Sequence, residues 1–270
     1  MIEIRLSTVD RLGEVLALPA DAVGIGQEGC LTKLPTTDEL RQAADTVRSA
    51  GRTVVVVAPI AWPRTADELH KRLLAVAGDG PTTIAANDLG TALSIMDDRP
   101  AGCTVVAGLG LTRSRPHSAN LKDSTPPRAQ LDESLMNVLA THGISAVEVD
   151  TDTEVSETGW QVRQLVDAVP VGYGRSCPTA RRHQTGPPGC QTLCDTPYQI
   201  TVNARWQLNH GHREPLPAGM SRPALTVWGN AVYQPATAEP TCDYRIIDAR
   251  WHTADSLAAA VGTHTIHIGR

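Results

Sequence analysis

The chain repeats one local pattern, a short apolar run followed by an amphipathic segment with its own helix start and stop signals. The clearest run is Thr53–Ala58 (TVVVVA), which is typical of a strand buried on both faces. On either side of it, Thr36-x-x-Glu39 and Thr65-x-x-Glu68 are capping boxes that predict helix starts. Such alternation predicts a parallel sheet with crossover helices. The expected strands are Ile2–Ile4, Asp21–Ile25, Thr53–Ala58, Thr82–Ala86, Cys103–Ala107 and Ala146–Val149.

Five or more such units fit a TIM-type (β/α) barrel, closed or incomplete, better than an open sheet. A dinucleotide-binding fold would need Gly-x-Gly-x-x-Gly between a strand and a helix, and Gly108-Leu109-Gly110 lacks the third glycine. We therefore expect a single α/β barrel domain over residues 1–270, with an inserted or C-terminal loop region that carries cysteines. Beyond that loop, Tyr198–Gln207 and Leu225–Tyr233 alternate like antiparallel strands.

Composition limits the partners of this chain. The net charge of −5 offers no positive field for nucleic acid. No apolar run reaches the roughly 18 residues of a membrane helix. The start, MIEIRLSTVDRL, lacks the basic and apolar segments of a secretion signal. These features predict a cytoplasmic protein that acts on a small molecule, without nucleic acid or membrane insertion.

Three of the six cysteines, Cys177, Cys190 and Cys194, fall within the turn-rich loop 174–196. Three thiols fit disulfides poorly, and zinc would favour two close Cys-x-x-Cys pairs. An iron–sulfur cluster is the favoured interpretation, with zinc and incidental thiols as alternatives.

A fourth ligand must come from elsewhere, and Cys30 is the best candidate. Residues that follow barrel strands share one face of the barrel, and both Cys30 and the loop of Cys177 follow expected strands. Cys242 is a possible substitute, whereas Cys103 lies inside an expected strand and is interpreted as a buried thiol.

The loop R-S-C-P-T-A-R at Arg175–Arg181, followed by Cys190-x-x-x-Cys194, resembles the cluster loop of the peptidase U32 family. It is most similar to the UbiV-like branch, which works in anaerobic ubiquinone hydroxylation. Further matches to that branch lie between residues 20 and 235. They are Cys30-Leu-Thr-Lys33, Gly51–Ala58, Asn87-Asp88-Leu89-Gly90 and Val227–Tyr233.

The resemblance implies a barrel-like fold with a 4Fe–4S cluster on Cys30, Cys177, Cys190 and Cys194. It implies dioxygen-independent hydroxylation, with prephenate or a similar organic oxygen donor as co-substrate. It also implies a heterodimer with a second U32-type chain, in which this chain is either the catalytic or a non-catalytic subunit. A peptidase is the third reading, although Gly-x-Ser-x-Gly and His-Glu-x-x-His are absent from the sequence.

The chain departs from the wider family just before its last cysteine pair. There the wider family has Asn-Arg-Gly, and this chain has Gly186-Pro-Pro-Gly189. The identity of the substrate therefore does not transfer with the resemblance.

Five other residues are candidates for substrate binding. Arg175 and Arg181 flank the thiols and could offset cluster charge or hold a carboxylate, unless they are solvated loop charges. Asn87 and Asp88 join a strand to a helix, where the alternatives are a polar contact at the barrel mouth and a plain helix N-cap. His117 follows a strand and could transfer protons, or could simply be solvated.

Overall fold

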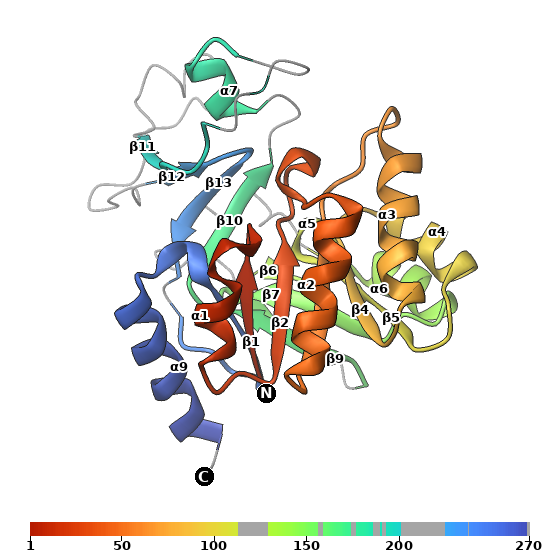
Figure 1. Ribbon diagram of the computed structural model, residues 1–270, viewed down its shortest axis with the longest axis horizontal. Coiled ribbons are helices and arrows are strands. Elements are labelled where there is room, and N and C mark those ends of the chain that lie inside the picture. The colour runs from red at the N-terminus through yellow and green to blue at the C-terminus, as the bar shows by residue number, and fades with distance from the viewer. Residues whose placement is uncertain are drawn as a thin grey trace.

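The computed structural model describes residues 1–112, 129–155, 159–173, 177–185, 190, 193–200, 225–236 and 238–268. Eight parallel strands form a closed barrel (Figure 1), which confirms the TIM-type prediction. In barrel order they are β1 (Ile2–Leu6), β2 (Ala22–Gly26), β3 (Thr53–Ala58), β4 (Thr82–Ala86), β5 (Cys103–Ala107), β7 (Ala146–Asp150), β9 (Gln161–Leu165) and β14 (Tyr244–Asp248). The last of these, β14, pairs with β1 and closes the ring.

Helices cover the outside of the barrel. They are α1 (Leu12–Leu16), α2 (Thr37–Ser49), α3 (Ala66–Gly78), α4 (Leu89–Asp98), α5 (Leu109–Thr112), α6 (Glu133–Thr141) and α9 (Ala254–Ile268), with 3-10 turns η1 (Val9–Arg11), η2 (Leu31–Lys33) and η4 (Ala249–Trp251). The capping box predicted at Thr36 is present, because Thr36 and Glu39 exchange both side-chain-to-backbone bonds. The one predicted at Thr65 does not form, since Thr65 Oγ1 donates to Trp62 O instead. No helix within the described residues is long and apolar enough to cross a membrane.

A second, antiparallel sheet stands at the carboxyl end of the barrel strands, at the top of Figure 1. Its order is β10 (Ala168–Tyr173), β13 (Ala231–Pro235), β12 (Leu225–Trp228) and β11 (Tyr198–Ile200). A short helix, α7 (Pro178–Arg182), lies beside this sheet. A two-stranded ladder of β6 (Ala129–Gln130) and β8 (Thr153–Glu154) completes the described strands.

Two expectations about strands need correction. The sequence gives no strand signal over β9, whose QVRQL contains polar residues at most positions. Conversely, the alternating residues Thr265–Ile268 suggest a short last strand by pattern alone, and they belong to helix α9. In both segments, contacts with the rest of the fold decide the secondary structure, and the local hydrophobic pattern does not.

The two faces of the barrel strands differ in chemistry. The outward residues of β1 and β3, such as Ile4 and Val56, pack with helix residues such as Leu40 in the main apolar core. The alternate residues of β1, Glu3 and Arg5, point inward and are nevertheless buried. A TIM barrel is usually filled by branched aliphatic side chains, so this charged interior is unusual.

Candidate functional site

The four cysteines selected from the sequence line one small, partly open cavity of ≈ 60 Å³. Its lining residues are Cys30, Thr32, Cys177, Thr179, Ala180, Thr185, Cys190, Leu193, Cys194, Gly229 and Asn230. The other two cysteines lie apart from this lining. Cys103 is buried in β5, and Cys242 Sγ donates to Tyr244 O at 3.0 Å.

The start of α7 positions Cys177. Its Sγ accepts from Ala180 N at 3.4 Å as the helix N-cap, and it donates to Gly229 O at 3.3 Å. Thr179 Oγ1 donates to the same carbonyl oxygen at 2.9 Å. Pro178 stands at the first helical position, where its missing N–H costs nothing. These bonds fix the first turn of α7 against the turn between β12 and β13.

That same turn also holds the loop of Cys30, which follows β2. Asn230 Nδ2 donates to Gly29 O at 2.5 Å. Space between them is tight, because a Cβ on Gly29 would lie 3.3 Å from Asn230 Cβ. On the other side of Cys30, Lys33 forms an ion pair with Asp195 at 2.5 Å. Two distant parts of the chain are therefore joined around the cavity.

Burial raises the pKa of the Cys194 thiol, and the nearby Lys33 ammonium opposes that rise. Asp195, Cys30 and Cys177 raise it further. The metal-free thiol is thus favoured in its protonated form, and a metal would have to displace that proton.

The donor set suits a soft metal centre, because four thiols are the usual ligands of an iron–sulfur cluster. Within the described residues, no group of three or more His, Cys, Asp or Glu side chains is already arranged to hold a metal ion. Binding of a metal centre would therefore require the four thiols to draw toward it.

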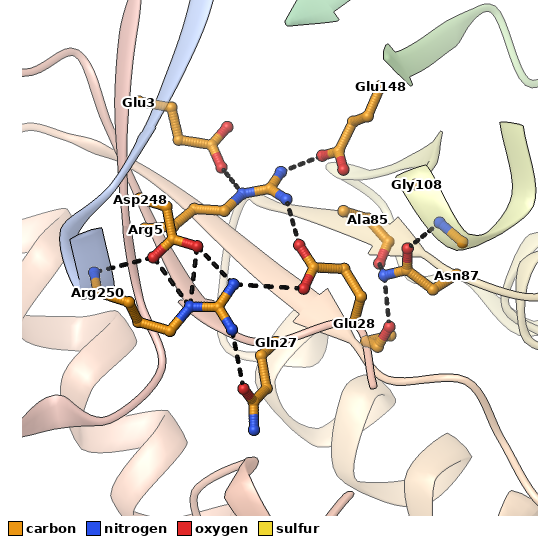
Figure 2. A network of polar contacts seen from close by, with 12 residues as sticks. Glu3, Arg5, Gln27, Glu28, Ala85, Asn87, Gly108, Glu148, Asp248 and Arg250 are labelled. Atoms are coloured by element: carbon orange, nitrogen blue, oxygen red, sulfur yellow. Dashed lines mark hydrogen bonds and ion pairs between the residues drawn. The ribbon is translucent and has the colours of Figure 1, made fainter. Parts of the chain in front are cut away.

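A second cluster of functional groups, which the sequence did not reveal, lies inside the barrel (Figure 2). The guanidinium group of Arg5 is surrounded by three carboxyl groups. Its Nε donates to Glu3 Oε1 at 2.8 Å, its Nη1 lies 3.5 Å from Glu28 Oε1, and its Nη2 pairs with Glu148 Oε1. All four side chains are at most 3% exposed.

Glu28 links this group to a second guanidinium. Its Oε2 lies 3.6 Å from Arg250 Nη2, and Asp248 binds Arg250 through both carboxylate oxygens. Arg250 Nη1 also donates to Gln27 Oε1 at 3.1 Å. The loop after β2 therefore contributes both to the charged network, through Gln27 and Glu28, and to the cysteine cavity, through Cys30.

A signal for this network does exist in the sequence. IEIRL and AVEVD place charged residues at alternate positions of strands that otherwise read as buried. A buried carboxylate or guanidinium is costly unless it is paired. Charged residues at alternate positions of a predicted barrel strand therefore predict ion pairs with one another across the barrel interior.

The remaining candidates have mixed outcomes. Asn87 Nδ2 donates to Ala58 O at 2.8 Å and its Oδ1 accepts from Gly110 N at 2.8 Å, so backbone contacts occupy its amide. Asp88 is the N-cap of α4 and accepts from Thr91 N at 2.8 Å.

Arg181 is exposed in the last turn of α7 and does not line the cavity. Its neighbour Arg182 stacks over the Tyr198 ring at 4.2 Å. Arg175 and His117 lie outside the described residues. Roles in substrate binding for these arginines, for His117 and for the Asn87–Asp88 pair remain predictions.

Comparison with known proteins finds a likeness among solved structures only. No protein-family model matches the sequence. No curated protein matches it either. Among solved structures, one described as the U32 peptidase Mk0906 is 14% identical, with 92% of each chain covered and a TM-score of 0.46.

Proposed function

We propose that this chain is an iron–sulfur protein of a dioxygen-independent hydroxylation system that acts on a small organic substrate. The observation that carries the proposal is the cysteine cavity, in which Cys30 meets three thiols from more than 140 positions later in the chain. Clustered thiols in a chain without disulfides are typical of metal centres. The hydroxylation chemistry rests on the resemblance of the cysteine loop to the UbiV-like branch of the U32 family.

In this proposal Cys30, Cys177, Cys190 and Cys194 hold a 4Fe–4S cluster. The cluster would supply one-electron chemistry for the reaction with an oxygen donor such as prephenate. The chain's own contribution is to exclude water and to balance charge. Lys33, whose ammonium acts electrostatically on both Cys30 and Cys194, offsets the negative charge of four thiolates.

A second candidate is a non-catalytic iron–sulfur subunit that pairs with a related U32-type chain. The size of the cavity favours it, because ≈ 60 Å³ leaves little room for a substrate beside a cluster. The cluster would then be structural or an electron relay, and the partner would supply the active site.

Anaerobic purification tests the metal centre. We expect a brown protein with visible charge-transfer absorbance and about four iron and four sulfide ions per chain. Cys190→Ala should abolish the absorbance, whereas Cys103→Ala is the matched control and should keep it. A colourless protein that contains zinc would refute the iron–sulfur assignment.

Adding prephenate to the cluster-loaded chain separates the two candidates. A catalytic subunit is expected to show a change in the electron paramagnetic resonance spectrum of the reduced cluster. A spectrum that stays unchanged, in a chain whose cluster is intact, favours the non-catalytic subunit.

A further inference from the structure

A second, larger pocket adjoins the cysteine cavity. Its volume of ≈ 600 Å³ is in the range of pockets that hold small molecules, whereas the cysteine cavity has only ≈ 60 Å³. We call it the arginine pocket, and its described lining residues are Arg182, His183, Leu193, Asp195, Thr196, Pro197 and Tyr198. The room for a substrate that the cysteine cavity lacks is therefore present beside it.

Two segments form the wall between the arginine pocket and the cysteine cavity. The first consists of three consecutive residues, of which Leu193 lines both hollows, Cys194 lines the cavity and Asp195 lines the pocket. The second is helix α7, near the top of Figure 1, where Ala180 lines the cavity and Arg182 lines the pocket. A molecule in the pocket would therefore lie next to a metal centre that the cysteines hold.

The end of α7, which carries Arg182, has a defined conformation. Thr185 N donates to Ala180 O at 2.7 Å and Gln184 N donates to Arg181 O at 3.1 Å, which are the two bonds of a Schellman motif. Gln184 adopts φ +54, in the left-handed region that costs a residue with a side chain about 1 kcal/mol. Strain of this kind persists where the surrounding structure fixes it, and it is concentrated at binding sites.

The guanidinium group of Arg182 is positioned for a ligand. It lies over the Tyr198 ring, 4.2 Å from the ring centroid. Such stacking fixes the plane of the guanidinium and leaves the N–H groups at its edge free to donate. Among the described residues Arg182 forms no ion pair. A guanidinium held in this way can bind a carboxylate through two parallel hydrogen bonds.

The charged groups that line the pocket leave it positive. Arg182 contributes one positive charge. Asp195 is the one carboxylate among the described lining residues, and it forms an ion pair with Lys33 at 2.5 Å. His183 adds either no charge or a further positive charge, and the exposed Arg181 does not line the pocket. An anion would therefore balance the charge of this pocket.

The other lining side chains favour an organic anion over an inorganic one. Leu193 and Pro197 are apolar, and Leu193 is 42% exposed. A bound ring would cover these surfaces and remove apolar area from water, which is worth about 25 cal/mol per Å². Inorganic phosphate or sulfate would leave them exposed.

We propose that the arginine pocket binds a small aromatic carboxylate, with the carboxylate on Arg182 and the ring against Leu193 and Pro197. That this molecule then reacts at the metal centre rests on the proposed function, whereas the binding itself uses none of the cysteines. The pocket favours the catalytic subunit over the non-catalytic one, because only the catalytic subunit needs room for a substrate.

The charge of the ligand can be tested with benzoate and benzamide, which have similar shape and differ in charge. By ligand-observed nuclear magnetic resonance on the full chain, benzoate should bind about tenfold more tightly than benzamide. Failure to bind benzoate, or equal binding of the two, would overturn the proposal. This comparison uses the wild-type protein, so it stands whatever the stability of any variant.

The position of the carboxylate can be tested at Arg182. Arg182→Met should weaken benzoate about tenfold and leave benzamide unchanged. Arg182→Lys keeps the charge without the flat fork, so the loss should be smaller. Arg99→Met is the control and should bind benzoate normally, because Arg99 is exposed just before β5, at the barrel end opposite the second sheet. Wild-type binding by Arg182→Met would refute the site.

Two competitors test the role of the apolar side. Acetate shares the carboxylate of benzoate and lacks its ring, so it should bind about tenfold more weakly than benzoate. Inorganic phosphate should not displace benzoate at equal concentration. Displacement by phosphate, or equal affinity for acetate, would show a general anion site and contradict the assignment of an aromatic ligand.

The pocket and the proposed function can fail separately, because benzoate binding is measured with or without a metal. A colourless protein that binds benzoate through Arg182 would refute the iron–sulfur assignment and support the pocket. A brown protein that does not bind benzoate would refute the pocket and leave the iron–sulfur assignment intact.

Discussion

Gly24 makes room for the ion pairs inside the barrel. A Cβ at this position would lie 2.7 Å from Glu3 Oε1 and 2.9 Å from Arg5 Cγ. Neither neighbour can easily retreat, because Glu3 and Arg5 bond to each other and both are fully surrounded. The charged network therefore requires a residue without a side chain at position 24.

Gly24→Ala is therefore expected to lower the free energy of unfolding by about 1–3 kcal/mol, through overpacking and distorted ion pairs. Urea denaturation measures the change. Gly13→Ala, in α1, is the control, because its Cβ would meet nothing within 4 Å and alanine is the better helix former. The explanation fails if the two variants are equally stable.

His252 makes stability depend on pH. Its Nε2 lies 2.7 Å from Asp167 Oδ1, and this hydrogen bond raises the pKa of the imidazole, with partial burial opposing the rise. A histidine with a raised pKa stabilises the fold fully below its unfolded pKa of about 6.5, and this contribution is lost as pH rises through the folded pKa.

The free energy of unfolding should therefore decline from about pH 6.5 upward, and His252→Gln should flatten that decline. Urea unfolding at a series of pH values measures both slopes. The exposed His142 provides the control variant His142→Gln, which should keep the wild-type slope. An unchanged slope in His252→Gln would show that other groups dominate.

At the scale of elements, the turn between β12 and β13 organises the cysteine cavity. Gly229 adopts φ +60 and presents its carbonyl oxygen to both Cys177 and Thr179. The adjacent Asn230 reaches the loop of Cys30. A turn of two residues therefore connects the early thiol with α7.

Asn230→Ala should loosen the loop of Cys30 and reduce the iron content of anaerobically purified protein. Substituting residues that support metal ligands typically lowers metal affinity by about 10–100-fold. Iron per chain at limiting iron measures the effect. Gln234→Ala is matched to it, since Gln234 lies on the same hairpin but bonds to Asp152 at 3.3 Å. Equal iron content in the two variants would exclude a supporting role for Asn230.

The elements also show what the sequence could and could not predict. The sequence predicts the strand Thr53–Ala58 because a barrel strand is buried on both faces, by helices outside and by side chains of other strands inside, and so has a continuous apolar run. The sequence does not predict the strand Gln161–Leu165. Its inward residue, Arg163, is stabilised by partners on other strands, and a local hydrophobic pattern contains no information about such partners. The convergence of the cysteines was predicted from the shared face of a barrel, even though β10, which leads to Cys177, belongs to the second sheet.

At the scale of the whole molecule, the barrel closes only when β14, late in the chain, pairs with β1. Ile2 pairs with Arg245, and the N-terminal amine donates to Asp243 O at 2.8 Å. Every barrel strand then has two neighbours, and cooperative loss of the ring should be needed to expose any of them. Among the described residues, the second sheet has β10 and β11 as edge strands and a small apolar cluster centred on Ala168, Ala231 and Tyr233.

Native-state hydrogen exchange should reveal this difference in stability. We expect amides of β3 and β4 to exchange only through global unfolding, and those of β11 and β12 to exchange at least about tenfold faster through local opening. Binding of the proposed cluster would tie the loop of Cys30 to Cys194, which precedes β11, and to Cys177, which bonds to Gly229 just after β12. It should therefore slow exchange in β11 and β12 selectively and leave β3 unchanged. Equally slow exchange of both sheets in the metal-free protein would show that they unfold as one cooperative unit. Cluster binding would then not be what stabilises the cysteine region.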